Sequence, residues 1–306
     1  MSSIKPKALK KGDTVAIAAP ASPFDRTEFE KGVNLLKSLG FHVIYREDIF
    51  SKDAYLAGPD ERRAAELMEH FTNPEVKAIF FARGGYGCQR LIPLLNEELI
   101  RKHPKIILGY SDITTLLIYL QQSFSWSVFH GPVVAKAMGD TFKDRGQKSL
   151  WKALTETQAL GKIQAEGFRF IRPGKCEGTL VGGCLSLLIT NLKSSYELDT
   201  DGKIIFMEDI NEKPYAIDRM LTQLKQAGKF KNAKGFVFGP FQNSGEGDAE
   251  VIAVILDVLK GIDVPIAFGF PSGHVDDMLS IPLGVKVKLN SENHSIEFVE
   301  GALSNE

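Results

Sequence analysis

The chain has 306 residues, of which 43% are hydrophobic and 25% charged, the balance of a globular protein with room for two domains of average size. Its 37 Lys plus Arg against 38 Asp plus Glu give a formal charge of -1. No overall basic field exists of the kind that attracts nucleic acid or an anionic membrane, so we expect neither as a partner.

The N-terminal segment and the spacing of cysteines and histidines exclude further classes of protein. Residues 1–11 are polar and rich in lysine and lack the apolar segment of a secretory signal, and no apolar stretch approaches the length of a membrane span. The three cysteines, Cys88, Cys176 and Cys184, have no metal-type spacing, and the six histidines include no HExxH motif. We expect a cytoplasmic protein with reduced cysteines, no metal site and no cofactor.

The first half of the chain alternates short apolar runs with helical patterns, which is typical of a parallel sheet with crossover helices. Phe29, Val33, Leu36 and Leu39 recur at helical spacing, and Gly40 ends that helix. Strands are expected at 14–18, 41–45, 78–82 and 106–108, and helices at 60–71 and 112–122.

The stretch from 139 to 175 differs in character, with a charged helical piece around Trp151 followed by turns that contain Gly and Arg. We therefore expect an N-terminal domain at 1–140, a linker at 141–175 and a C-terminal domain at 176–306. For the C-terminal domain, strands are expected at 203–207, 235–238, 264–268 and 285–289, and helices at 215–227 and 248–259.

Ser111 stands where an apolar strand ends, a glycine permits a sharp turn and a helix begins. This is the layout of a nucleophile elbow, in which the turn exposes the hydroxyl and the helix N-terminus offers N–H groups to an oxyanion. The G-x-S-x-G pattern is incomplete, because Ile113 replaces its last glycine. Alternatively, Ser111 caps the helix, although Thr114 stands where a capping box needs Glu or Gln. From this motif alone, the cap is the favoured interpretation.

The segment Arg83-Gly84-Gly85-Tyr86-Gly87 follows another predicted strand. Its glycines let the backbone approach a ligand with free N–H groups. A phosphate cradle is one use, but no Gly-Lys-Ser/Thr follows and the dinucleotide-binding spacing is absent. An oxyanion-hole donor and a plain tight turn are the other interpretations.

A hydroxyl nucleophile needs a base, and imidazole is the usual one near neutral pH. His274 lies in a loop rich in Gly and Pro after a predicted strand, where catalytic side chains are often carried. His130 also follows an apolar strand and is a possible site residue, although a histidine in such a position is more often buried in the core.

The base needs a carboxylate to hold its tautomer. Glu208 and Asp209 directly follow the apolar strand 204–207, a position where acids also serve as solvated or capping residues. Asp276 and Asp277 are nearer to the histidine in sequence, but their setting is typical of a turn.

Taken together and in this order, these pieces resemble the LD-carboxypeptidase family of serine peptidases, which includes murein tetrapeptide carboxypeptidases and microcin C self-immunity peptidases. The matching segments are Gly84-Gly85-Tyr86-Gly87, Gly109-Tyr110-Ser111-Asp112-Ile113-Thr114, the strand-end Glu208, and Gly273-His274 followed by Ile281-Pro282-Leu283-Gly284. The resemblance runs over nearly the whole chain. One departure is Cys184 in Gly182-Gly183-Cys184-Leu185, where many members have Asn.

The resemblance implies that Ser111 is the nucleophile, His274 the general base and Glu208 the acid that orients it. The backbone N–H groups of Gly85 and Asp112 would then form the oxyanion hole. The implied fold is α/β: a flavodoxin- or amidotransferase-like N-terminal domain with a parallel sheet, joined to a smaller β-rich α/β domain.

The activity implied is hydrolysis of the amide between an L-configured residue and a terminal D-amino acid, as in conversion of murein tetrapeptide to tripeptide during cell-wall recycling. We expect a murein-derived peptide as substrate and a homodimer as the assembly. Three alternatives stay open: a peptidase for peptidyl or aminoacyl nucleotides, as in microcin C immunity; a non-catalytic carboxylate-binding protein; and a cysteine amidotransferase that uses Cys88.

Overall fold

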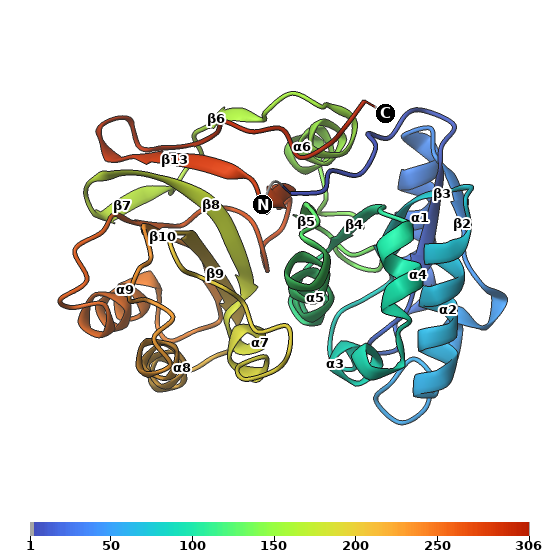
Figure 1. Cartoon of the computed structure of the whole chain (residues 1–306), viewed down its shortest axis with the longest axis horizontal. Helices are drawn as coiled ribbons and strands as arrows, with labels where there is room; N and C mark the ends of the chain where they lie inside the picture. The colour runs from blue at the N-terminus through green and yellow to red at the C-terminus, as the bar shows by residue number, and fades with distance from the viewer. Residues whose placement is uncertain (1–2, 306) are drawn as a thin grey trace.

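Two β-sheets organise residues 3–305, the part of the chain that this computed structural model describes. They lie in two lobes, with the first half of the chain on the right of Figure 1 and most of the second half on the left. The α/β class and the two-domain architecture expected from the sequence are confirmed.

The first sheet has six strands in the order β12-β5-β4-β3-β1-β2. Its strands are β1 (Thr14–Ala18), β2 (His42–Ile44), β3 (Val76–Phe81), β4 (Ile106–Gly109), β5 (Val128–His130) and β12 (Ile281–Leu283). The strands β1 to β5 run parallel, and β12 is antiparallel to β5. Val15 to Ala18 of β1 are fully buried, as expected of a parallel strand covered on both faces.

Helices connect these parallel strands. They are α1 (Arg26–Ser38), α2 (Asp60–Thr72), α3 (Cys88–Leu91), α4 (Glu97–Lys102) and α5 (Thr114–Phe124), with short 3₁₀ turns η1 (Glu47–Phe50), η2 (Ile92–Leu94) and η3 (Ser111–Ile113). Helix α1 begins after Asp25, whose side chain accepts the Glu28 N–H at 3.0 Å, and it buries Phe29, Val33 and Leu36. Capping and the 3.6-residue period that the sequence displays therefore produce this helix.

The second sheet has eight strands in the order β6-β14-β13-β8-β9-β10-β11-β7. Its strands are β6 (Gly161–Ile163), β7 (Arg169–Arg172), β8 (Lys175–Cys184), β9 (Ile204–Ile210), β10 (Gly235–Gln242), β11 (Ile266–Phe268), β13 (Lys286–Asn290) and β14 (Ser295–Phe298). The central strands β8 to β11 are parallel, and the flanking strands are antiparallel. Helices α7 (Leu185–Thr190), α8 (Pro214–Gln226) and α9 (Asp248–Val258) accompany this sheet, with the turn η4 (Ser291–Asn293). Helix α6 (Asp144–Thr155) instead packs against the first sheet, where its Trp151 stacks on Phe41.

The stretch 141–175, expected to join the domains, contains α6, β6 and β7, and both strands pair within the second sheet. Conversely, β12 from the second half of the chain pairs with β5 of the first sheet, with Ile281 opposite His130. This crossover fixes the segment just before β12 beside the first sheet. It is the feature of the fold that positions the candidate site.

Among residues 3–305, no helix combines the length and the apolar character needed to cross a bilayer.

Candidate active site

Ser111 follows β4 at a sharp backbone turn. Its φ of 62° lies in the left-handed region, which residues other than glycine rarely adopt. The turn leads into η3 and then α5, and neither begins with a side-chain cap hydrogen bond. Interpreting Ser111 as a helix cap is therefore wrong. Its strained position between strand and helix is the geometry of a nucleophile elbow.

The glycine loop 84–87 lies directly against this turn. A Cβ atom at position 84 would lie 2.9 Å from Ser111 Cβ, 3.0 Å from Ser111 Oγ and 3.4 Å from the backbone nitrogen of Asp112. Only glycine leaves room for so close an approach. Ser22 holds the loop from the other side, because its N–H donates to the Gly84 carbonyl at 3.2 Å and its Oγ accepts the Tyr86 N–H at 3.2 Å.

Asp112 joins the turn to the glycine loop. Its buried carboxylate accepts the Cys88 N–H at 2.9 Å, at the start of α3. Cys88 is fully buried, and burial together with the charge of Asp112 raises the pKa of its thiol well above the ordinary value. A reactive cysteine needs an accessible thiol with a lowered pKa. The burial and the raised pKa of the Cys88 thiol are therefore evidence against Cys88 as a nucleophile.

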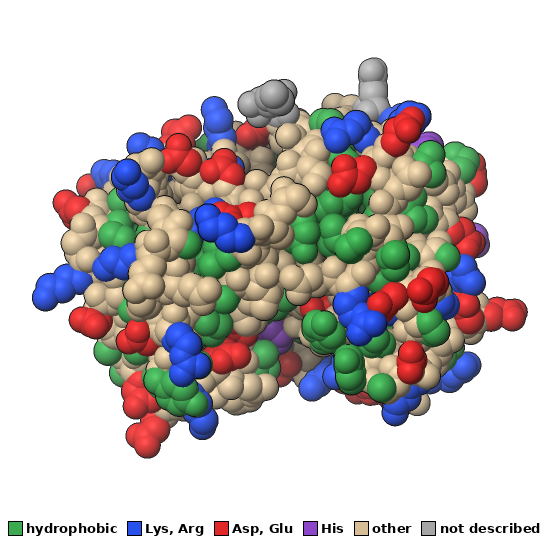
Figure 2. All heavy atoms as spheres, turned by 60° about the horizontal axis from the view of Figure 1, so that its bottom comes forward, with side chains coloured by type: hydrophobic (Ala, Val, Ile, Leu, Met, Phe, Trp, Pro, Cys, Tyr) green, Lys and Arg blue, Asp and Glu red, His purple; other side chains and the backbone are tan. Residues whose placement is uncertain are grey.

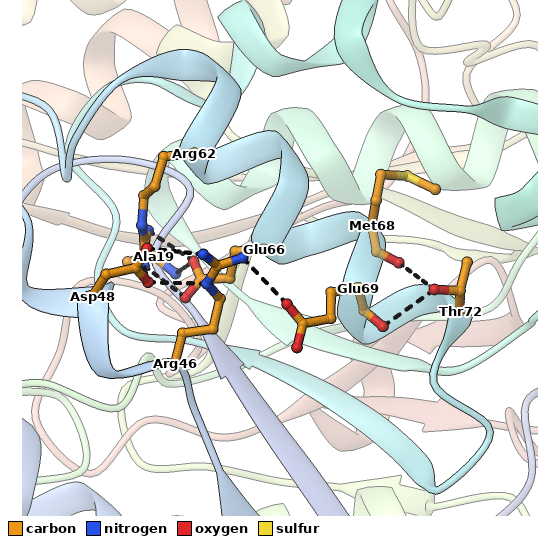
Figure 3. A network of polar contacts seen from close by, with 8 residues as sticks. All are labelled: Ala19, Arg46, Asp48, Arg62, Glu66, Met68, Glu69 and Thr72. Carbon is orange, nitrogen blue, oxygen red and sulfur yellow. Dashed lines mark hydrogen bonds and ion pairs between the residues drawn. The ribbon is translucent and has the colours of Figure 1, made fainter.

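A network of charged side chains supports the loop that follows β1. Glu66 is fully buried on α2 and accepts the Ala19 N–H at 2.8 Å. Arg62 pairs with Glu66 at 2.9 Å and with Asp48 at 3.0 Å, and Arg46 extends the network from Asp48 (Figure 3). The strand end beside the glycine loop is thereby tied to the outer helix.

Arg63, the next residue along α2, is also fully buried. Its guanidinium donates to the carbonyls of Gly58 and Gly87, at 3.1 Å each, and to that of Pro20. A single side chain thus holds three loops, and one of them is the glycine loop. This role could not be predicted from the sequence, because Arg63 lies in a strongly charged helical segment that is typical of an exposed face.

His274, whose side chain is 11% exposed, forms a hydrogen-bonded pair with the completely buried Glu208. The Nδ1 atom of His274 lies 2.7 Å from Glu208 Oε2, and the His274 backbone N–H donates to the same oxygen at 3.1 Å. Gly273 has a φ of 120°, and a Cβ atom there would lie 2.6 Å from Glu208 Cδ, so only glycine permits this contact.

Burial and hydrogen bonding act in opposite directions on this pair. Burial favours the neutral carboxyl of Glu208, but the contacts with His130 and His274 outweigh it and hold the pKa of Glu208 well below its usual range. Burial also lowers the pKa of His274, but the hydrogen bond to Glu208 and its charge prevail, and the pKa of His274 is raised. The pair therefore has a carboxylate whose charge favours an imidazolium beside it.

Tyr110 connects this pair to Ser111. Its ring packs edge-on against His274, with the ring centroids 4.8 Å apart, and it directly precedes Ser111 in the chain. With Nδ1 bound to Glu208, Nε2 is the His274 atom that remains for proton transfer. Among the described residues, no hydrogen bond joins Ser111 to His274, a bond that in unliganded enzymes often tightens only with substrate.

A cleft of about 410 Å³ opens beside Tyr110 and His274. The surface is hollowed between the two lobes, and a histidine side chain is visible in the hollow (Figure 2). The charged residues that line the cleft are Glu28, Lys136, Asp140 and Asp276, and the neutral polar ones are Thr141, Gln242 and Asn243. Such a lining suits a peptide that carries charges of both signs.

Two of the other acids considered from the sequence, Asp209 and Asp277, have structural partners. Asp209 accepts the Ser186 N–H at 2.8 Å, near the start of α7. Asp277 accepts the backbone N–H groups of Lys143 and Gly146, at 2.9 and 2.7 Å, and so caps α6. Neither forms a hydrogen bond with His274, whereas Glu208 does.

Within residues 3–305, no group of three or more His, Cys, Asp or Glu is arranged to hold a metal ion.

Comparison with known proteins adds sequence and structural relatives. The model of the LD-carboxypeptidase N-terminal domain matches residues 15–131, and that of the LD-carboxypeptidase C-terminal domain matches residues 177–289. The probable murein peptide carboxypeptidase of Bacillus subtilis (strain 168) is 40% identical over 292 residues, which cover 94% of this chain and 92% of the relative.

Two solved structures superpose over nearly the whole chain. The microcin C7 self-immunity protein MccF in complex with aspartyl sulfamoyl adenosine has a TM-score of 0.92 and 28% identity, covering 98% of this chain and 100% of its own. The muramoyltetrapeptide carboxypeptidase from Oxalobacter formigenes has a TM-score of 0.84 and 27% identity, covering 95% and 99%.

Proposed function

The chain belongs to the LD-carboxypeptidase family of serine peptidases, and from this premise we propose that it hydrolyses the amide bond between an L-configured residue and a terminal D-amino acid. The substrate class is a murein-derived peptide, with tetrapeptide converted to tripeptide during cell-wall recycling. The observation that carries the proposal is the hydrogen-bonded His274–Glu208 pair packed on Tyr110, the residue that directly precedes the strained Ser111.

In the proposed mechanism, Ser111 Oγ attacks the scissile carbonyl while His274 Nε2 takes its proton. Glu208 holds Nδ1–H and stabilises the imidazolium that forms. The backbone N–H groups of Gly85 and Asp112 stabilise the oxyanion, which the contact between the glycine loop and the Ser111 turn supports. Collapse of the intermediate expels the D-amino acid, whose amine receives the proton from His274, and water then hydrolyses the acyl-enzyme.

The elbow and its supports supply the rigidity that this mechanism needs. Asp112 ties the turn to the glycine loop, and Arg63 ties the loop to the strand ends behind it. Donors fixed before the reaction stabilise developing charge without reorganising, which is usually the largest single catalytic contribution.

A second candidate function is cleavage of an aminoacyl nucleotide. It is favoured by the TM-score of 0.92 with MccF in complex with aspartyl sulfamoyl adenosine. The same nucleophile, base and oxyanion donors would serve that reaction, so the two candidates differ only in what the cleft accepts.

One assay separates them. The purified protein is incubated with murein tetrapeptide, its L-Ala isomer, its C-terminal amide and an aminoacyl sulfamoyl-adenosine, and the products are identified by mass spectrometry. Release of D-Ala from the tetrapeptide supports the proposal. Fast cleavage of the nucleotide conjugate without cleavage of the tetrapeptide would favour the second candidate, and binding without any cleavage would favour a non-catalytic protein.

We also propose that the protein is cytoplasmic and forms a homodimer. Tyr55 and Tyr86, with ring centroids 5.9 Å apart, are 59% and 45% exposed and offer an apolar contact for a second copy. Mass photometry over a dilution series tests the dimer, and cell fractionation tests the location.

A further inference from the structure

Two buried polar atoms face each other beneath the candidate site. Within the described chain, His130 Nε2 and Glu208 Oε1 each lack a hydrogen-bond partner, and they lie 3.7 Å apart. Both side chains are completely inaccessible to solvent. Leaving two such groups unpaired in the interior is unfavourable, so their mutual arrangement requires an explanation.

The fold places His130 directly below the nucleophile turn. It ends β5, opposite Gly109 of β4 on one side and Ile281 of β12 on the other. Its ring packs edge-on against Phe206, with centroids 5.1 Å apart, and against Tyr110, at 6.2 Å. Packing against two aromatic rings therefore restricts the direction of its Nε2 atom.

The neighbours of the other ring nitrogen restrict where the protons lie. His130 Nδ1 lies 3.0 Å from Ser272 Oγ, and that hydroxyl lies 2.8 Å from the Leu279 carbonyl oxygen. If the Ser272 proton goes to Leu279, Nδ1 must be the donor to Ser272. If the proton goes to Nδ1 instead, His130 carries its own proton on Nε2.

In the first arrangement, a neutral His130 would direct a bare Nε2 at a carboxylate oxygen, so two acceptors would face each other in the interior. A proton on Nε2 as well, giving an imidazolium, removes this conflict. In the second arrangement Nε2 is protonated already. Both favourable arrangements therefore place an N–H between Nε2 and Glu208 Oε1.

We propose that His130 is a positioning residue for the reaction: its Nε2–H faces Oε1 of Glu208 while His274 occupies Oε2, so the carboxylate is held in one plane between two imidazoles. This inference rests on the proposed function, because the orientation of Glu208 matters to catalysis only if His274 is the base. At 3.7 Å the contact is electrostatic rather than a formed hydrogen bond, and it shortens when the carboxylate turns toward His130.

The substitution His130→Phe tests this directly, since phenylalanine keeps the ring packing and removes the N–H. Glu208 Oε1 would then lose the N–H that faces it, and kcat should fall about 10- to 100-fold with little change in KM. The carboxylate would also become more basic and hold the His274 proton more tightly. The acid limb of the pH–rate profile should therefore move to higher pH.

The variants at position 130 leave the other titratable groups near Glu208 and His274 unchanged. Tyr110, Cys184 and Asp209 face Glu208 or His274, and burial raises the pKa of each. A change in the acid limb between variants is thus attributable to position 130.

Two further variants separate positioning from general damage. His130→Gln places an amide N–H near the site of Nε2 and should restore part of kcat and return the acid limb toward that of the wild type. His70→Phe is the matched control, because His70 is another buried histidine with an unpartnered Nε2, on α2 and outside the site. It should leave the pH profile unchanged.

The readouts are kcat and KM against pH, thermal unfolding, and the pH dependence of fluorophosphonate labelling of Ser111, which needs no peptide. Nitrogen NMR of the wild type reports whether His130 Nε2 carries a proton, even if His130→Phe does not fold. A bare Nε2, or identical pH profiles for folded His130→Phe and His70→Phe, would overturn the inference. If Ser111 is labelled but no L,D-peptide is cleaved, the proposed substrate is wrong. The role of His130 can then still be tested through the pH dependence of the labelling rate.

Discussion

Replacing Glu208 by Gln tests the proposed catalytic role of the carboxylate, and the structure determines how the amide must lie. The Oε2 position of Glu208 accepts from both the backbone N–H and the Nδ1–H of His274, at 3.1 and 2.7 Å. An amide nitrogen placed there would face two donors. The amide oxygen must therefore take this position, which preserves the His274 tautomer and removes the negative charge. The amide nitrogen then occupies the Oε1 position, where it faces His130.

The magnitude follows from this orientation. A charge-assisted hydrogen bond is stronger than a neutral one by about 1–2 kcal/mol, and the imidazolium formed during attack would also lose its counter-charge in a buried setting. Together these effects predict a fall in kcat/KM on the order of 100-fold. Loss of the correct tautomer costs about 10⁴-fold in the serine protease triad, and we expect Glu208→Gln to stay well short of that.

The pH dependence gives the sign of the effect. The base must be neutral to accept the Ser111 proton, so activity is lost as pH falls through the pKa of His274. Burial lowers that pKa, and Glu208 raises it above the ordinary value. Without the charge of Glu208, the effect of burial weighs more heavily, and the acid limb of kcat/KM should shift to lower pH.

The assay is a pH series of kcat/KM for wild type, Glu208→Gln and Asp277→Asn. Asp277 is the matched control, because its carboxylate caps α6 and forms no hydrogen bond with His274. A Glu208→Gln enzyme with wild-type rates, or an acid limb that moves to higher pH, would refute the reasoning. Equal effects of both substitutions would mean that the loss reflects folding rather than the pair.

The remaining predictions concern the nucleophile, the glycine loop and the substrate. Ser111→Ala should unfold at a temperature close to that of the wild type but lose on the order of 10⁴-fold or more in kcat, since the members of a triad act as a unit; near-normal turnover would exclude Ser111 as nucleophile. Gly84→Ala would bring a methyl group to 3.0 Å from Ser111 Oγ and should lower kcat about 100-fold, since a displacement of about 1 Å has such an effect; circular dichroism checks the fold, and an unchanged kcat would contradict the close approach. Inverting the terminal D-Ala to L-Ala should slow release by about 100-fold or more, because the pinned carboxylate turns the carbonyl off its line of attack; equal rates by mass spectrometry would remove the stereochemical part of the proposal.

The sequence was sufficient to predict the buried parallel strands and their helices. The strand predicted at 14–18 matches β1 residue for residue, and the helix predicted at 60–71 differs from α2 by one residue. The apolar residues of these segments recur with a spacing that is compatible with one type of secondary structure and with few others. The short strands β6, β7, β12 and β14 were not predicted, because three or four residues of mixed character form a strand only once a partner edge is present.

The candidate site was only partly predictable. Position after a strand identified Ser111, His274 and Glu208 as candidates, but the pattern alone favoured a cap for Ser111, and the roles came from the family resemblance. The buried charged residues that hold the site in place could not be recognised from the sequence around them. Arg63 and Glu66 are buried although charged side chains are rarely so. The partners by which they hold the site, the carbonyls of Pro20 and Gly87 and the Ala19 N–H, are distant in the sequence.

The position of β12 explains why the site needs both lobes. The proposed nucleophile and oxyanion donors follow strands of the first sheet, whereas Glu208 lies in β9 of the second sheet, which runs to Ile210 and so includes Glu208 rather than ending before it as expected. The loop that carries His274 is bounded by β11 of the second sheet and by β12, which pairs with β5 of the first. The hydrogen bond between His130 and Ser272 fixes this loop a second time. Relative movement of the lobes is thereby restricted at the point where Ser111 and His274 must meet, and a displacement of about 1 Å there would affect the chemical step before it affected binding.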